Sequence, residues 1–201
     1  ALLSNEWILL DKIWNKNVVF SKSGLPFKGG IISYGKVKRE IRELLRNPRI
    51  AAVTTMIDFY GLPNDFPGKN SLKGTNPFDR VNHIEDEMGR DVDDPRFIPF
   101  LTLHEFEALL FTAPEEIVST FPHWRSARQL LAEAARFSSP EEINEGEDTH
   151  PAQRIVRAIP SYRKRIDGPR IIERIGLKSV RASCPHFNQW VEKLEILWGN
   201  G

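Results

Sequence analysis

Two apolar runs rich in β-branched residues constrain the fold of this chain more than any other feature. Residues 50–57 read IAAVTTMI and residues 96–103 read RFIPFLTL, and neither run alternates regularly between apolar and polar positions. Strands that are covered on both faces have this pattern, which is typical of parallel sheets between layers of helices. The two runs therefore predict central strands of an α/β protein. Pro99 predicts an edge position or a bulge in the second run, because proline cannot donate a ladder hydrogen bond.

Helical patterns alternate with these strands. Apolar residues recur at helical spacing in residues 6–14, 34–46 and 81–88, and residues 17–20 form a further short apolar run. Strands that alternate with helices predict right-handed βαβ units and a mainly parallel sheet flanked by helices. We place this α/β core in residues 1–112.

The remaining residues, 113–201, predict a C-terminal helical lobe packed on the core. Helical patterns separated by prolines follow one another there without a convincing strand. Within this lobe, residues 138–149 (SSPEEINEGEDT) are acidic and nearly free of apolar side chains, so we interpret them as a surface connection between helices. A chain of 201 residues, 40% of them hydrophobic, is long enough to bury a core and a smaller lobe.

Composition bears on the compartment and on the partners. Basic and acidic residues number 28 and 27, so the net charge of +1 neither favours nor excludes a polyanionic partner. The single cysteine, Cys184, has no partner for an internal disulfide, and no apolar run approaches the ~20 residues that span a bilayer. Since the sequence also starts without a recognisable signal peptide, it predicts a cytoplasmic protein with no membrane association. Assembly into a homo-oligomer stays open.

Acidic residues follow both apolar runs. Asp58 comes directly after the first run, and His104-Glu105-Phe106-Glu107 follows the second. The carboxyl ends of parallel strands meet at one edge of a sheet, so we expect Asp58 and Glu105 to share a site. Carboxylate oxygens are the ligands that Mg²⁺ prefers. The alternatives are structural: Asp58 caps its own turn, and Glu105 and Glu107 stabilise the first turn of a helix.

Cations are dense between residues 154 and 181. Our candidates for contacts with nucleic acid are Arg154, Arg157, Lys164 and Arg165. On a face directed toward the acidic site, these side chains would contact phosphates without reading the base sequence. The alternative is a solvated helical face.

Other reactive side chains give weaker indications. The histidines outside the acidic motif, His150 among them, lack the spacing of metal ligands, and we interpret them as structural. Cys184 and His186 are a further candidate pair, a nucleophile and a base of a small-molecule hydrolase.

Long, irregular motifs in this chain resemble a known bacterial family. The segments TTMIDFYGLPNDFPG, RFIPFLTLHEFEALLF, SYRKRIDGP and GLKSVRASCPHFNQW resemble the family known as domain of unknown function 4276 (DUF4276) over nearly the whole chain. The resemblance implies a Toprim-like fold, similar to the metal-dependent domain of topoisomerases, primases and overcoming-lysogenization-defect nucleases. It also implies Mg²⁺ or Mn²⁺ as the cofactor, nucleic acid and an ATPase as partners, and a role in phage defence.

The resemblance also implies roles for individual residues. In Toprim proteins, an early glutamate and a later Asp-x-Asp pair bind Mg²⁺; Asp58 matches the first aspartate of the pair, and Tyr60 stands in place of the second. Glu105 and Glu107, in the family's His-Glu-x-Glu motif, would supply further ligands, with His104 beside them. Lys164 resembles the lysine that related nucleases place near the scissile phosphate to stabilise the transition state. The catalytic residues implied in this way are Asp58, Glu105 and Lys164.

The start of the chain departs from the family pattern. Members open with a strand and Glu-Gly-x-Thr-Glu, whereas Ala1–Asn5 precede Glu6 here without that glutamate. Two functions are therefore expected: a Mg²⁺-dependent nuclease or phosphoryl-transfer subunit, or a module without catalysis that binds nucleic acid or a partner ATPase. We expect this chain to be nearly inert as a nuclease, and a chain that carries the motif to cleave with a dependence on Asp58.

Overall fold

The computed structural model describes residues 18–20, 33–72, 76–143 and 150–199, and it divides into two compact units. We call the described part of Trp14–Leu103 and Trp190–Gly201 the α/β unit, and His104–Gln189 the helical unit. The predicted helix at residues 6–14 lies outside the described residues. The elements of the α/β unit are β1 (Val18–Phe20), α2 (Tyr34–Leu45), β2 (Ala52–Thr54), β3 (Ile57–Asp58), the 3-10 helix η1 (Lys69–Ser71), α3 (Pro77–Val92), β4 (Phe97–Ile98) and β5 (Leu101–Thr102).

All described strand pairs are parallel. β2 lies between β1 and β4, with Val53 paired to Val19 on one side and to Phe97 on the other. β3 pairs with β5 through Ile57 and Leu101. The prediction of an α/β protein with a parallel sheet is therefore confirmed.

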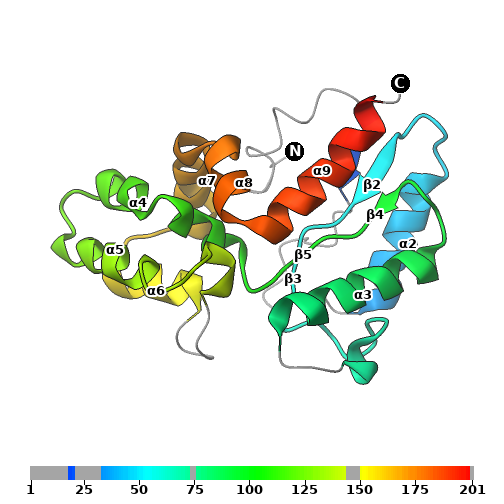
Figure 1. Ribbon diagram of the computed structural model, residues 1–201, viewed down its shortest axis with the longest axis horizontal. Helices are drawn as coiled ribbons and strands as arrows, with labels where there is room; N and C mark the ends of the chain where they lie inside the picture. Colours follow the sequence, from blue (N-terminus) through cyan, green and yellow to red (C-terminus); the bar gives the residue numbers. More distant parts are fainter. Residues whose placement is uncertain (1–17, 21–32, 73–75, 144–149, 200–201) are drawn as a thin grey trace. The chain divides into compact units, whose positions relative to one another are not determined.

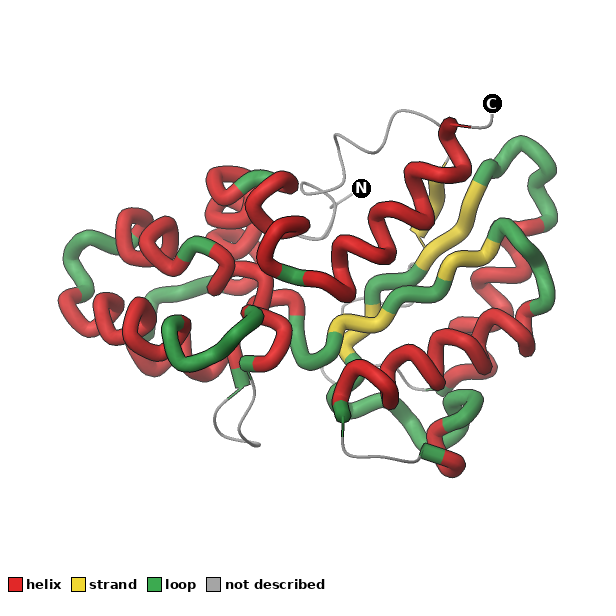
Figure 2. Tube along the Cα trace, in the orientation of Figure 1, coloured by secondary structure: helices red, strands yellow, loops and turns green. Residues whose placement is uncertain are grey.

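The two predicted central strands are each interrupted, which corrects our expectation of continuous strands over residues 50–57 and 96–103. Figure 2 shows strand, loop and strand again along both segments. Pro99 has no N–H for the ladder, and a side chain bridges the gap instead: the Thr55 hydroxyl accepts from the Phe100 N–H at 3.0 Å and donates to the Phe100 carbonyl at 3.1 Å. The interruption is thus hydrogen-bonded rather than open.

Helices α2 and α3 cover one face of the strands (Figure 1). Their apolar residues, among them Val37, Ile41, Ile84 and Met88, form one buried cluster with Val53 and other strand residues. The side chains of Ser33 and Asn76 accept from N–H groups in the first turns of the two helices. α3 is longer than predicted, because Asn76 and Pro77 provide a cap and a first-turn proline ahead of the apolar pattern.

The C-terminal helix α9 (Pro185–Gly199) covers the other face of the strands. Trp190 is fully buried and stacks on Phe100, with ring centroids 4.5 Å apart. Its indole N–H donates to the Thr54 hydroxyl at 2.9 Å, and that hydroxyl donates to the Ile98 carbonyl at 2.6 Å. One threonine therefore links α9, β2 and β4.

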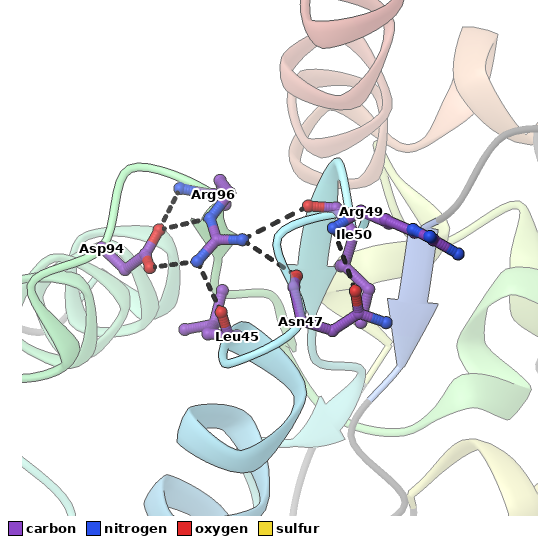
Figure 3. A network of polar contacts seen from close by, with 6 residues as sticks. All are labelled: Leu45, Asn47, Arg49, Ile50, Asp94 and Arg96. Carbon is purple, nitrogen blue, oxygen red and sulfur yellow. Dashed lines mark hydrogen bonds and ion pairs between the residues drawn. The ribbon is translucent and has the colours of Figure 1, made fainter.

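Arg96 fastens the loop that joins α2 to β2 (Figure 3). Its guanidinium donates to the carbonyls of Leu45, Asn47 and Ile50 and forms an ion pair with Asp94 at 2.8 Å. The hydrogen bonds from Arg96 lower the pKa of Asp94. Leu45 is the last residue of α2, so Arg96 supplies a donor to the final carbonyl of this helix.

The helical unit consists of short helices and includes the first residues of α9. These are the 3-10 helix η2 (Phe106–Thr112), α4 (Pro114–Thr120), η3 (Arg125–Arg128), α5 (Gln129–Ala134), η4 (Pro140–Glu142), α6 (Pro151–Ala158), α7 (Lys164–Ile175) and α8 (Leu177–Ser183). Several begin with a proline, which suits the first helical position because its missing N–H is not needed there. Among the described residues of the chain, none of the helices is long and apolar enough to cross a membrane.

The acidic segment at residues 138–149 is not simply a surface connection, which corrects our interpretation. Ser139, Glu141 and Ile143 are buried, and the Glu141 carboxylate accepts from the backbone N–H groups of His186 and Phe187. A carboxylate in this position satisfies orphan donors at the start of α9. Residues 144–149 lie outside the described part.

Candidate functional site

Glu105 and Glu107 lie at the beginning of η2, and both side chains contact residues outside this helix. Glu105 has an extended backbone just before η2, and its side chain makes no capping bond to η2. Both side chains are largely sheltered from solvent, with exposed fractions of 13% for Glu105 and 6% for Glu107. Buried carboxylates need partners, and these partners come from later in the helical unit.

Glu105 is held by three donors. Its Oε2 accepts from the Ala152 N–H at 3.0 Å and lies 2.9 Å from Nδ1 of His150, while its Oε1 lies 3.2 Å from Nζ of Lys164. Ala152 is in the first turn of α6, so Glu105 caps a helix distant in sequence. Burial would raise the pKa of Glu105, but Lys164, the Ala152 N–H and His150 outweigh it, so the pKa is lowered. The carboxylate is therefore kept ionised.

Lys164 joins the two glutamates. Its ammonium nitrogen lies 3.4 Å from Oε2 of Glu107, in addition to its contact with Glu105. Lys164 is the first residue of α7, and its side chain is 48% exposed although both partners are sheltered. We call these three residues the acid–lysine cluster. In this cluster, one half-exposed ammonium group contacts the half-buried Glu105 and the buried Glu107.

Two buried residues, Asp167 and Tyr162, lie close to Lys164 in the sequence. Asp167 is buried and accepts from the backbone N–H of Arg163 at 2.8 Å, which fixes the start of α7. Tyr162 is 6% exposed, and its buried hydroxyl has no hydrogen-bond partner among the residues that the structure describes. Burial raises the pKa of Tyr162, and the charges of Glu107, Asp167 and Glu105 raise it further, so the hydroxyl stays protonated.

His104 precedes the cluster in the chain. Burial lowers its pKa, against the opposing influence of Glu105. The imidazole is therefore neutral at pH 7, and a neutral imidazole can accept a proton.

Comparison with known proteins identifies the family. The model of the family described as domain of unknown function (DUF4276) matches residues 6–195. The chain belongs to DUF4276. No match was found among curated proteins or among solved structures. The family resemblance predicted from the sequence motifs is thus confirmed, while the Toprim relation stays a prediction.

The donor set of this DUF4276 chain fits a hard divalent cation that is completed by water or phosphate. Mg²⁺ is commonly bound through one or two protein carboxylates together with phosphate oxygens and waters. Glu105 and Glu107 supply two carboxylates on one unit. Over the described ranges, no group of three or more His, Cys, Asp and Glu side chains is arranged to hold a metal ion.

Asp58 and Tyr60 belong to the α/β unit, whereas Glu105 belongs to the helical unit. Asp58 ends β3, and its exposed carboxylate accepts from the Thr102 hydroxyl on β5 at 2.8 Å. Tyr60 is 51% exposed in the following turn. The prediction that Asp58 and Glu105 share one site stays a prediction.

The basic residues that were predicted to contact nucleic acid differ in their exposure to solvent. Arg154 is buried, pairs with Glu133 at 3.0 Å and lies over the Phe137 ring. A sheltered, paired guanidinium is unsuited to phosphate contact, so we assign Arg154 a structural role and correct our choice of it. Arg157 on α6 and Arg165 on α7 are exposed, as is Lys164.

The alternative with Cys184 as a nucleophile does not suit the structure. Cys184 is fully buried, and burial together with the Glu141 charge raises its pKa to about 12 against the influence of Thr112. A thiolate is the reactive form, and this environment suppresses it.

Sequence reasoning missed His150 and Tyr162. His150 was interpreted as a structural residue, and it contacts Glu105 from the residue before α6. The following Pro151 is a helix-start signal that could have placed His150 at a helix N-terminus. For Tyr162, only its position two residues before Lys164 was a signal.

Proposed function

We propose that this DUF4276 protein is a metal-dependent phosphoryl-transfer protein that cleaves nucleic acid at the acid–lysine cluster. The observation that carries the proposal is the Lys164 ammonium, half exposed and shared by two sheltered carboxylates. Phosphoryl transfer requires mainly charged groups in fixed positions. A site of this kind combines carboxylates that could bind a metal ion with an ammonium group that could bind a phosphate. The Toprim-like relation, inferred from the motifs, agrees with the parallel strands but rests on the resemblance.

The roles of the residues follow from their surroundings. Glu105 and Glu107 would hold Mg²⁺ or Mn²⁺, which when bound neutralises phosphate charge and lowers the pKa of water. Glu105 is kept ionised by its own donors, so it needs no deprotonation before binding. Lys164 would meet a phosphate oxygen from its exposed side. A neutral imidazole can accept a proton, so His104 is the candidate base.

Nucleic acid would be bound through exposed cations of the helical unit, Arg157, Lys164 and Arg165. Contacts of this kind release counterions, so binding would weaken as salt rises. A role in phage defence beside an ATPase belongs to the same proposal and rests on the resemblance alone. A cytoplasmic location rests on the composition of the sequence, and self-association stays open.

A second candidate is a module that binds nucleic acid or an ATPase without catalysis. It is favoured by the state of the carboxylates: both oxygens of Glu105 already have donors, and Glu107 is paired with Lys164. Carboxylates that neutralise a lysine and cap a helix have a complete structural role without a metal.

A cleavage assay separates these candidates. Single-stranded DNA, double-stranded DNA and RNA are incubated with the protein in Mg²⁺ or Mn²⁺, with EDTA as a blank. Because this chain is expected to be nearly inert, a version that carries the family's Glu-Gly-x-Thr-Glu motif is assayed beside it. We expect metal-dependent cleavage by that version, which falls about a hundred-fold or more in Glu107→Gln and is retained in the control Glu115→Gln, an exposed residue of α4. Binding without cleavage by the version that carries the motif would favour the second candidate. Cleavage that persists in Glu107→Gln would remove the cluster from the proposal.

A further inference from the structure

A tight turn directly after β3 carries the exposed side chain of Tyr60. The Leu62 N–H donates to the Phe59 carbonyl at 3.3 Å, and Gly61 has a φ of 79°, as is typical of the third position of a type II turn. The Phe59 N–H donates to the Thr102 carbonyl of β5 at 2.9 Å, which ties the turn to the strands. Tyr60 is 51% exposed in this turn, so its ring is available for contact with a ligand.

Two basic side chains contact the ring of Phe59 in the same turn. The guanidinium of Arg80, near the start of α3, lies 5.3 Å from the ring centroid, and Nζ of Lys69, on η1, lies 6.0 Å from it. The Lys69 ammonium also donates to the Leu62 carbonyl, so it lies at the turn that carries Tyr60. Contacts between a cation and the face of an aromatic ring are attractive and hold both groups in place. We call Phe59, Tyr60, Lys69 and Arg80 the aromatic–basic patch.

The two cations of the patch have no acidic partner among the residues that the structure describes. Neither Lys69 nor Arg80 forms an ion pair there, whereas Arg96 in the same unit lies 2.8 Å from a carboxylate oxygen of Asp94. Burial lowers the pKa of Lys69, and the charge of Arg80 lowers it further. Two like charges at one ring repel each other, and an anion between them would relieve the repulsion. The charge of the patch therefore suits a phosphate.

We propose that the aromatic–basic patch binds single-stranded nucleic acid, with a phosphate between Lys69 and Arg80 and an unpaired base stacked on Tyr60. Proteins that bind single strands without reading their sequence combine cations along the backbone with exposed aromatic rings on which bases stack. A base within a duplex is already stacked on its neighbours, so Tyr60 should contribute to the binding of single strands only. The inference rests on the proposed function, since it takes nucleic acid as the ligand, and it adds a binding surface on the α/β unit.

Substitution of the ring and of a cation should affect binding differently. Tyr60→Ala removes the ring, so we expect the affinity for a labelled oligothymidine of about 12 nucleotides to fall about five-fold or more, with an unchanged salt dependence. Tyr60→Phe keeps the ring and should bind like the unaltered protein. Arg80→Gln removes one charge, so the affinity should fall and the slope of log affinity against log salt should flatten by about 0.7. The control Arg49→Gln removes a charge from an exposed residue of the same unit and should leave binding unchanged.

The experiment measures fluorescence anisotropy at several KCl concentrations, with EDTA present to prevent cleavage. The ligands are the labelled oligothymidine, a labelled DNA duplex of equal length and a labelled polyglutamate peptide. Unfolding in urea verifies that each variant is folded. We expect Tyr60→Ala to weaken the binding of the single strand and to leave the binding of the duplex unchanged.

Failure of the inference can be distinguished from failure of the proposed function. If the unaltered protein does not bind oligothymidine, both fail. If Lys164→Met weakens binding but Tyr60→Ala and Arg80→Gln keep full affinity, only the inference fails. If Arg80→Gln weakens the binding of polyglutamate as much as that of oligothymidine, and Tyr60→Ala changes neither, the patch binds acidic peptides and the inference is overturned. An equal loss of affinity in Tyr60→Phe and Tyr60→Ala would exclude stacking on the ring.

Discussion

Lys164 lies 3.2 Å from Oε1 of Glu105, although the two residues are 59 positions apart in the chain. The contact ties the first residue of α7 to the start of η2, and the same glutamate caps α6 through the Ala152 N–H. One carboxylate therefore organises three helices of the helical unit. Its structural and proposed chemical roles can be separated by the choice of substitution.

Glu105→Ala should destabilise the helical unit by about 1–2 kcal/mol, because α6 loses a charged cap and Lys164 loses an acceptor. Hydrogen exchange measured by mass spectrometry should show faster exchange of peptides covering Pro151–Ala158. The control is Glu173→Ala, an exposed position on α7. Equal protection of α6 in both variants would show that Glu105 is not its cap.

Thr54→Val tests the hydroxyl that links α9 to the strands of the α/β unit. Valine has nearly the same shape, but the Trp190 N–H loses this acceptor and the Ile98 carbonyl loses this donor. We expect a loss of about 1–3 kcal/mol in the free energy of unfolding in urea. Thr54→Ser keeps the hydroxyl and should cost less. Similar losses for serine and valine would mean that packing, rather than the hydrogen bonds, matters at this position.

Glu141 should give the stability a dependence on pH. Burial, the largest cause, raises its pKa, although the N–H groups of His186 and Phe187 act against it. An acid with a raised pKa binds its proton more tightly when folded, so its contribution to stability falls as pH rises from the ordinary value of 4.5 through the raised value. Unfolding measured between pH 4 and pH 8, as an approximate range, should show this slope.

Glu141→Gln cannot titrate, so the slope due to this residue should be absent from the variant. Glu115→Gln, at an exposed position on α4, should retain it. Parallel stability curves for Glu141→Gln and the unaltered protein would mean that the pKa of Glu141 is not raised.

The local patterns of the sequence predicted the elements well and their long-range contacts poorly. The helix at Tyr34–Leu45 followed from the spacing of Val37 and Ile41, and the parallel strands followed from two β-branched runs. The interruption of those strands depends on the Thr55 hydroxyl reaching Phe100, which has no local signal beyond Pro99.

The candidate site shows the same limit. The motif around Glu105 and the position of Lys164 could be recognised separately, but their pairing depends on how η2, α6 and α7 pack. Glu141 was misinterpreted for a related reason: a run of acids predicts solvent exposure unless a distant helix start provides donors. Arg154 was misinterpreted because burial cannot be read from a count of cations.

The claim that the acid–lysine cluster binds a divalent cation is tested most directly by titration with Mn²⁺. Binding is measured as the loss of the free-ion signal in electron paramagnetic resonance. We expect the protein to bind Mn²⁺, Glu107→Gln to weaken this binding about ten-fold or more, and Glu173→Gln to bind Mn²⁺ like the unaltered protein. Circular dichroism of each variant verifies folding. Mn²⁺ binding that is unchanged in Glu107→Gln, or absent from the unaltered protein, would contradict the assignment of the acid–lysine cluster as a cation site.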